Sequence, residues 1–295
     1  MGYLLLAIAL ICGTAKGYCG KQTSACIVGY KDAVMSNLIR MVLCVVISLG
    51  VVVLGGDASH LLPPLPFWGI AALSGITTSV VVIAWLLVVR RSAYLMLDVS
   101  QILSVLVPTV LGQLFFHEQV RPIQWLGLGV LILSALIMCS YNNSIKARLT
   151  VSTFGLLALH CIAVGLMDFS QKLYVKLYPA VPVSVFNLYT YLFSTVTLIL
   201  CYGLAKPQPA DMPKADFHKI FWYIFAMSVL LFGNVTFKTL AAQHLDSVLI
   251  YPLNMGLSMI LSAAMAALIF KEKLTRKCLI GLIVAFSGLM MINML

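Results

Sequence analysis

The chain has 295 residues, of which 62% are hydrophobic and only 9% are charged. Soluble domains carry about a quarter charged residues, so this composition excludes a water-soluble globular protein and indicates a chain surrounded by lipid. The formal net charge of +10 does not indicate a nucleic-acid partner, because the basic residues collect in the connections between apolar segments.

Ten transmembrane helices are predicted, each near the ~20 residues that a bilayer requires. Inside lipid, backbone groups must bond within the chain, and the apolar segments are too long, and alternate too little, for barrel strands. Proline-rich and asparagine-rich connections separate several of the helices. The predicted helices span residues 3–21, 33–54, 67–89, 96–116, 123–140, 152–175, 182–204, 219–241, 247–270 and 276–294.

The sequence repeats itself at a spacing of 154 residues, which brings Trp68 to Trp222 and Ser74 to Ser228. Five helices per repeat is an odd number, so the second repeat must insert upside down relative to the first. The predicted fold is therefore an all-α polytopic membrane protein with ten transmembrane helices in two inverted five-helix repeats. These repeats are residues 1–145 and 146–295, which together form one membrane domain. Further matching pairs are Ile70 and Ile224, Ala72 and Ala226, Glu118 and Glu272, Gly127 and Gly281, and, at a spacing of 150, Asn37 and Asn187.

Inverted repeats of this kind place a solute site near the midplane of the membrane, open to each side in turn. This arrangement favours a transporter over a receptor, a channel or a scaffold. No Gly-x-x-x-x-Gly-Lys-Ser/Thr motif is present, so the chain is not expected to use ATP itself. The eight cysteines form no Cys-x-x-Cys pair or His/Cys cluster, so no metal, cofactor or disulfide framework is predicted.

The segments 114–127 and 268–281 each combine a glutamate after an apolar run with a glycine nine residues further on. They resemble the signature that closes the fourth and ninth helices of EamA-type transporters of the drug/metabolite transporter superfamily. Lys21 and Arg40 also fit that pattern. The resemblance covers essentially the whole chain and implies a basket whose cavity is lined by helices 1–4 and 6–9. It implies no particular solute, because the superfamily exports amino acids, sugars, drugs and nucleotide sugars.

Three basic residues and one acidic residue fall inside predicted helices, where an ionised group needs a partner, an aqueous cavity or a function. Lys16 and Asp168 occupy nearly equivalent positions of the first and sixth helices, which face each other in the family. They are interpreted either as a fixed ion pair or as contacts for a charged solute or a coupling proton. Lys238 either meets an anionic group of the solute or extends toward the membrane surface. Arg40 is interpreted as a packing or interfacial arginine.

A polar stripe on the ninth helix and its counterpart on the fourth are the remaining candidates for a solute site. Their residues recur at three- and four-residue steps and so share one helix face. Ordinary helix packing through small polar residues explains them equally well. Trp85 is a weaker candidate, and His160 is interpreted as a hydrogen-bonded packing residue. The stripe residues are Tyr251, Asn254 and Ser258 on the ninth helix, with Ser100, Gln101 and Ser104 on the fourth.

Glu118 and Glu272 are expected to bond to free N–H groups of the helix that follows each of them. Gly13 and Gly17 have the spacing of a close helix contact, within the chain or in a homodimer. Lysine and arginine are far more numerous in the odd-numbered connections, so these are placed in the cytoplasm and both termini outside the cell membrane. This departs from most of the family.

The leading functional hypothesis is a secondary transporter of a small polar or charged organic solute, amino-acid-like or drug-like, that works by alternating access. A nucleotide-sugar or sugar-phosphate exchanger is the alternative within the class, favoured by Lys16 and Lys238. An intramembrane enzyme or a channel is the alternative from another class. The sequence offers no paired acid and base or metal-ligand cluster, so an enzyme is not expected.

Overall fold

The computed structural model describes residues 1–24, 26–27, 29–90, 94–139, 151–205, 217–269 and 276–293, and all regular structure among them is helical. The predicted all-α class is therefore confirmed. The predicted segment 96–116 is divided into two helices. In chain order the elements are α1 (Gly2–Ser24), α2 (Tyr30–Leu54), η1 (Asp57–His60), α3 (Leu65–Arg90), α4 (Tyr94–Ser104), α5 (Leu106–Phe116), α6 (Pro122–Cys139), α8 (Val151–Leu177), α9 (Val183–Leu204), α10 (Phe217–Ala241), α11 (Ser247–Leu268) and α12 (Arg276–Asn293).

Six of the described helices are long and apolar enough to cross a membrane: α1, α2, α3, α8, α9 and α10. Their outward faces carry large apolar side chains at helical spacing. On α2, for example, Val42, Val46, Leu49 and Val53 are all exposed. Water does not tolerate such continuous apolar surface on a monomer, whereas lipid does. The chain is an integral membrane protein.

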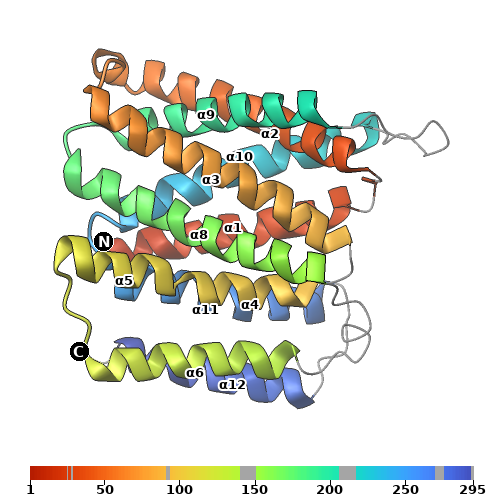
Figure 1. The fold of residues 1–295 in the computed structure, drawn as a ribbon, viewed down its shortest axis with the longest axis vertical. Coiled ribbons are helices and arrows are strands. Elements are labelled where there is room, and N and C mark those ends of the chain that lie inside the picture. Colours follow the sequence, from red (N-terminus) through yellow and green to blue (C-terminus); the bar gives the residue numbers. More distant parts are fainter. Residues whose placement is uncertain are drawn as a thin grey trace. The chain divides into compact units, whose positions relative to one another are not determined.

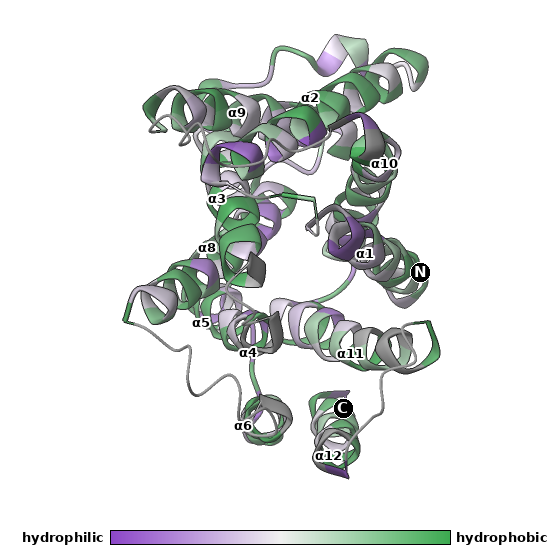
Figure 2. Cartoon of the chain, turned by 90° about the vertical axis from the view of Figure 1, so that its right-hand side faces the viewer, coloured by the Kyte–Doolittle hydropathy of each residue, from purple (hydrophilic) through white to green (hydrophobic). Residues whose placement is uncertain are grey.

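The described residues form two compact units, and each unit combines segments from both predicted repeats. The first unit comprises Met1–Leu87 and Leu166–His244, and the second comprises Val88–Gly165 and Leu245–Leu295. In the first unit α1 runs alongside α10, and α2 packs against α9 and α10 (Figure 2). Gly13 permits this close approach, since a Cβ atom there would lie 2.9 Å from Asn234 Nδ2. Asn234 donates a hydrogen bond to the carbonyl of Ala9.

An aromatic cluster closes one end of the first unit, where α3 begins, α8 ends and α9 begins. Phe67 makes edge-to-face contacts with the rings of Tyr174, Tyr178, Phe186 and Tyr189 at centroid distances of 5.6–6.0 Å. Two hydrogen bonds tie the loop around η1 to α9. Ser184 donates to Asp57 at 2.5 Å, and the Tyr189 hydroxyl donates to the carbonyl of Leu61.

In the second unit, α6 and α12 lie side by side (Figure 1). A Cβ atom on Gly127 would lie 2.8 Å from the carbonyl oxygen of Gly288, so only glycine allows this approach. Further along the same pair of helices, Ser134 Oγ donates to the carbonyl of Gly281 at 2.8 Å.

The break between α4 and α5 falls at Val105, three residues before Pro108. Proline has no N–H, so Pro108 cannot donate to the carbonyl of Ser104 one turn earlier. Gly165 of α8 packs on this carbonyl, where a Cβ atom would lie 2.8 Å from the oxygen. The break between α4 and α5 is thus accommodated by a glycine on the neighbouring helix.

Glu118 follows α5 and caps a helix. Its Oε2 accepts a hydrogen bond of 2.9 Å from the backbone N–H of Ser247, the first residue of α11. The left-handed backbone of His117 turns the chain before it. The hydrogen bond to Ser247 thus connects Glu118 to a helix far along the chain, which the sequence did not indicate. Glu272 lies outside the described residues.

Candidate functional site

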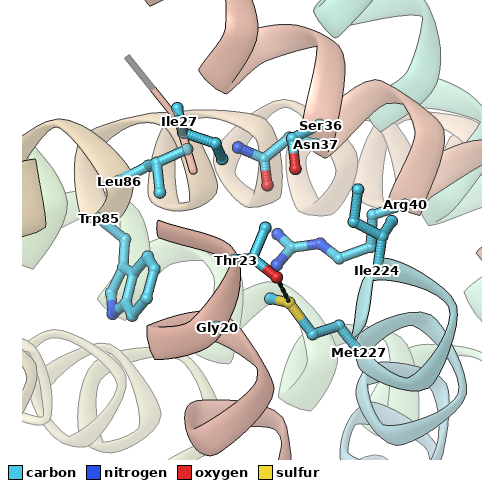
Figure 3. Close-up of a pocket in the computed structure, with 10 residues that line it drawn as sticks. All are labelled: Gly20, Thr23, Ile27, Ser36, Asn37, Arg40, Trp85, Leu86, Ile224 and Met227. Atoms are coloured by element: carbon cyan, nitrogen blue, oxygen red, sulfur yellow. Dashed lines mark hydrogen bonds between the residues drawn. The ribbon is translucent and has the colours of Figure 1, made fainter. Parts of the chain in front are cut away.

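The first unit contains a small pocket where α1 and α3 end and α2 begins, with α10 completing the wall (Figure 3). Its volume is about 10 Å³, the room of a single water molecule. A larger solute therefore needs a movement of these helices. The lining residues are Gly20 and Thr23 of α1, Ile27 of the connection after α1, Ser36, Asn37 and Arg40 of α2, Trp85 and Leu86 of α3, and Ile224 and Met227 of α10.

Arg40 is the charged residue of this pocket. It lies ten residues after the start of α2, and only 7% of its surface is exposed. Figure 3 shows its side chain extending from α2 into the pocket toward Thr23. Among the described residues its Nε has no hydrogen-bond partner, and the guanidinium has no ion pair. Ser228 of α10 donates to its backbone carbonyl and so fixes this part of α2.

Lys16 of α1 is a second cation beside Arg40. It is partly buried and lies close enough to Arg40 and Lys238 for their charges to act on it. Among the described residues it has neither an ion pair nor a hydrogen bond. Three cations from α1, α2 and α10 thus gather in one region of the first unit.

Lys238 of α10 forms the ion pair with Asp168 of α8 at 2.5 Å, and their side chains are 4% and 0% exposed. This corrects two expectations. The cation in contact with Asp168 is Lys238 and not Lys16, because Lys238 reaches the carboxylate from α10, which packs along α1. Lys238 also does not extend toward the membrane surface, because its ammonium is held in the interior by this carboxylate.

Hydroxyl and amide groups complete the polar part of the site. Tyr191 of α9 is 1% exposed, its hydroxyl has no partner among the described residues, and it lies within electrostatic range of Arg40. Asn37 donates to the carbonyls of Ala33 and Val82, which anchors α2 to α3. Thr23 Oγ1 lies 2.9 Å from the carbonyl of Cys19 and 3.6 Å from Met227 Sδ.

Trp85, a weaker candidate from the sequence, also lines the pocket. The six predicted stripe residues belong to the second unit, on α4 and α11, which pack against each other. Ser100 Oγ lies 2.8 Å from Nδ1 of His160, which confirms His160 as a hydrogen-bonded packing residue. Ser104 Oγ donates to the carbonyl of Gln101, Tyr251 is fully buried, and Asn254 Oδ1 has no partner among the described residues. Ser258 is half-buried on the same helix.

The sequence did not indicate that Thr23, Ser36, Asn37 and Arg40 line one pocket, with Tyr191 nearby. A signal for two of them was present, because Asn37 and Arg40 lie three residues apart and share a face of α2. Nothing in the sequence distinguished Tyr191 from the other tyrosines. Among the described residues, no group of three or more histidine, cysteine, aspartate or glutamate side chains has the arrangement of a metal site.

Comparison with known proteins establishes a fold relative. A protein of solved crystal structure is similar to this chain with a TM-score of 0.76 at 11% sequence identity, over 99% of this chain and 96% of that one. At this identity the likeness shows the fold alone. No protein-family model and no curated protein sequence matches the chain.

Proposed function

We propose that this chain is a secondary transporter of a small polar or charged organic solute that works by alternating access, with its solute site at the Arg40 pocket. The observation that carries the proposal is a buried arginine without a partner among the described residues, inside helices long enough to span a membrane. Ionised groups at such positions are costly and are kept where they bind solutes or ions. The tight pocket fits a conformation in which the site is closed.

The two inverted five-helix repeats, of ten transmembrane helices in all, belong to this proposal. Two pairs of contacts related by the repeat, at spacings of 150 to 154 residues, support it. Asn37 contacts Val82, and Asn187 of the second repeat contacts Thr236, which is the counterpart of Val82. Gly127 contacts Gly288, and Ser134 bonds to Gly281. Gly281 is the counterpart of Gly127 and Gly288 is the counterpart of Ser134, so the repeat converts each contact into the other. The resemblance to EamA-type transporters is a proposal on the same footing.

An exchange experiment tests the function without knowledge of the solute. Purified protein in liposomes is loaded with a cell-metabolite extract, and mass spectrometry follows which solutes cross in each direction. A carrier gives saturable movement that is accelerated by solute on the opposite side. Unsaturable flux without this acceleration would indicate a channel, and a product of altered mass would indicate an intramembrane enzyme. Either result would contradict the proposal.

The proposed orientation places both termini outside the cell membrane. That assignment rests on the excess of lysine and arginine in the odd-numbered connections and counts Lys172 with the even-numbered ones. In the structure Lys172 is buried in α8 and bonds to the carbonyl of Ala242. It therefore does not belong to an external connection, and removing it makes the bias toward the odd-numbered connections larger. A C-terminal cysteine tag should react with an impermeant maleimide on intact cells. Reaction only after the membrane is opened would reverse the assignment.

A further inference from the structure

We propose that the Arg40 pocket binds an oxyanion, the carboxylate or phosphate group of a small organic acid. This deepens the proposed function and rests on it for the movement of the solute across the membrane. Binding itself is a separate property, and it can be tested without transport.

The charges near the pocket are unbalanced. Lys16, Arg40 and Lys238 are three cations in one region of the first unit. Asp168 is the buried acidic residue that the structure describes in this unit, and it is held by Lys238. One carboxylate against these three cations leaves a surplus of two positive charges inside apolar helices, and Lys172, a further buried cation of this unit, adds to it. An anion in the pocket reduces this surplus, whereas a cationic solute would increase it.

The side chain of Arg40 is suited to an oxyanion. A guanidinium is a planar fork of N–H donors that matches two oxygens of a carboxylate or phosphate. Arg40 is more than nine-tenths buried, extends into the pocket, and has an Nε without a partner among the described residues. An arginine kept only for packing has its donors satisfied by carbonyl or carboxylate oxygens, because a buried unpaired donor destabilises the fold. The donors of Arg40 are thus available to a ligand.

A second hydrogen-bond donor lies near Arg40. The Tyr191 hydroxyl is buried, lies within electrostatic range of Arg40, and has no partner among the described residues. Buried tyrosine hydroxyls usually find a hydrogen-bond partner. Tyr191 is not one of the residues that line the pocket, but an oxyanion held by Arg40 would supply an acceptor near both groups.

The wall on the other side of the pocket indicates an organic acid and not a bare inorganic ion. Trp85 and Leu86 lie across the pocket from Arg40 (Figure 3). Trp85 and Met227 both lie close to Gly20. A Cβ atom on Gly20 would lie 3.2 Å from the Trp85 ring and 3.4 Å from Met227 Cε. A ligand whose apolar part packs against these side chains, and whose oxyanion group bonds to Arg40, matches both sides of the pocket.

Thermal unfolding of the purified full chain in lipid nanodiscs tests the site, with sodium phosphate and sodium acetate as probes. Sodium chloride at equal ionic strength and ethanolamine hydrochloride are the controls. We expect a saturable rise of the unfolding midpoint with at least one of the two oxyanions and none with ethanolamine. Phosphate acting alone or acetate acting alone identifies which oxyanion the site prefers. The inference is overturned if neither oxyanion raises the midpoint above the chloride control.

Variants assign the effect to Arg40. We expect Arg40→Gln to weaken the oxyanion affinity by about tenfold or more, the value of a charge-assisted hydrogen bond, and Arg40→Lys to weaken it less. Lys176→Gln, which removes an exposed cation of the same unit, is the matched control and should leave the affinity unchanged. If Arg40→Gln does not fold, Lys16→Gln gives the second reading, with a smaller loss. Equal affinity in the wild type and in the variants that fold would overturn the inference.

The outcome separates this inference from the proposed function. Oxyanion binding through Arg40 without any solute exchange in liposomes would uphold the site and contradict the carrier. Exchange of a neutral or cationic solute that is unchanged in Arg40→Gln would uphold the carrier and contradict the oxyanion site.

Discussion

Removal of the Asp168 carboxylate should destabilise the protein strongly, and the size of the effect follows from the ion pair in the structure. Asp168→Asn leaves the Lys238 ammonium without its charged partner, in a place where the two side chains are 4% and 0% exposed. Breaking a buried pair by removing one partner costs about 3–5 kcal/mol. Replacing both partners by neutral side chains of similar size is far less costly, because no buried charge then remains.

Unfolding in mixed detergent micelles measures this directly for wild type, Asp168→Asn, Lys238→Met and the double variant. We expect each single variant to lose about 3–5 kcal/mol and the double variant to recover most of that loss. Losses below about 1 kcal/mol in both single variants would match an exposed surface pair. That result, or losses that simply add in the double variant, would refute the reasoning.

Three further expectations concern helix packing, each measured by thermal or detergent unfolding. Gly127→Ala should lose about 1–3 kcal/mol, because its Cβ would lie 2.8 Å from the carbonyl of Gly288, whereas Gly129→Ala on the same helix has open space and should lose nothing. Gly75→Ala should lose a similar amount, with its Cβ 2.6 Å from the carbonyl of Thr190, and Gly69→Ala is its control on α3. If a glycine and its control behave alike, that close approach is not rigid. Glu118→Gln should lose up to about 2 kcal/mol, because the N-terminus of α11 favours a negative charge, and an unchanged stability would show that Glu118 is not the cap.

The helical class and most of the helix positions were predictable because lipid imposes one rule on every segment. An apolar run of about twenty residues in a membrane becomes a helix whatever its neighbours are. The break at Val105 could be anticipated only as a kink, because its place depends on Gly165 receiving the carbonyl of Ser104. The target of Glu118 was not predictable, because α11 begins 129 residues later in the chain.

The sequence was sufficient to identify the charged residues of the interior, but not to predict which of them form an ion pair. Charged residues inside apolar segments stand out in the sequence, and Lys16, Asp168 and Lys238 were identified on that basis. Which of the two lysines reaches Asp168 depends on how α10 packs along α1, and the residue pattern does not contain that information. Arg40 resembled a packing residue because its separation from acceptors is visible only once its neighbours are placed.

The aromatic cluster and the Arg40 pocket lie near opposite ends of α3 in the first unit. Phe67 and Trp85 are eighteen residues apart on this helix, about 27 Å at 1.5 Å per residue, close to the thickness of the hydrocarbon core. In a carrier of the proposed kind, a solute would meet two different barriers in series. The first is electrostatic, at the Arg40 pocket, and the second consists of the packed aromatic rings around Phe67. Salt screens attraction between charges but leaves contacts between apolar rings nearly unchanged. Ionic strength should therefore alter how readily a solute is captured from one side and leave its passage past the rings on the other side unaffected.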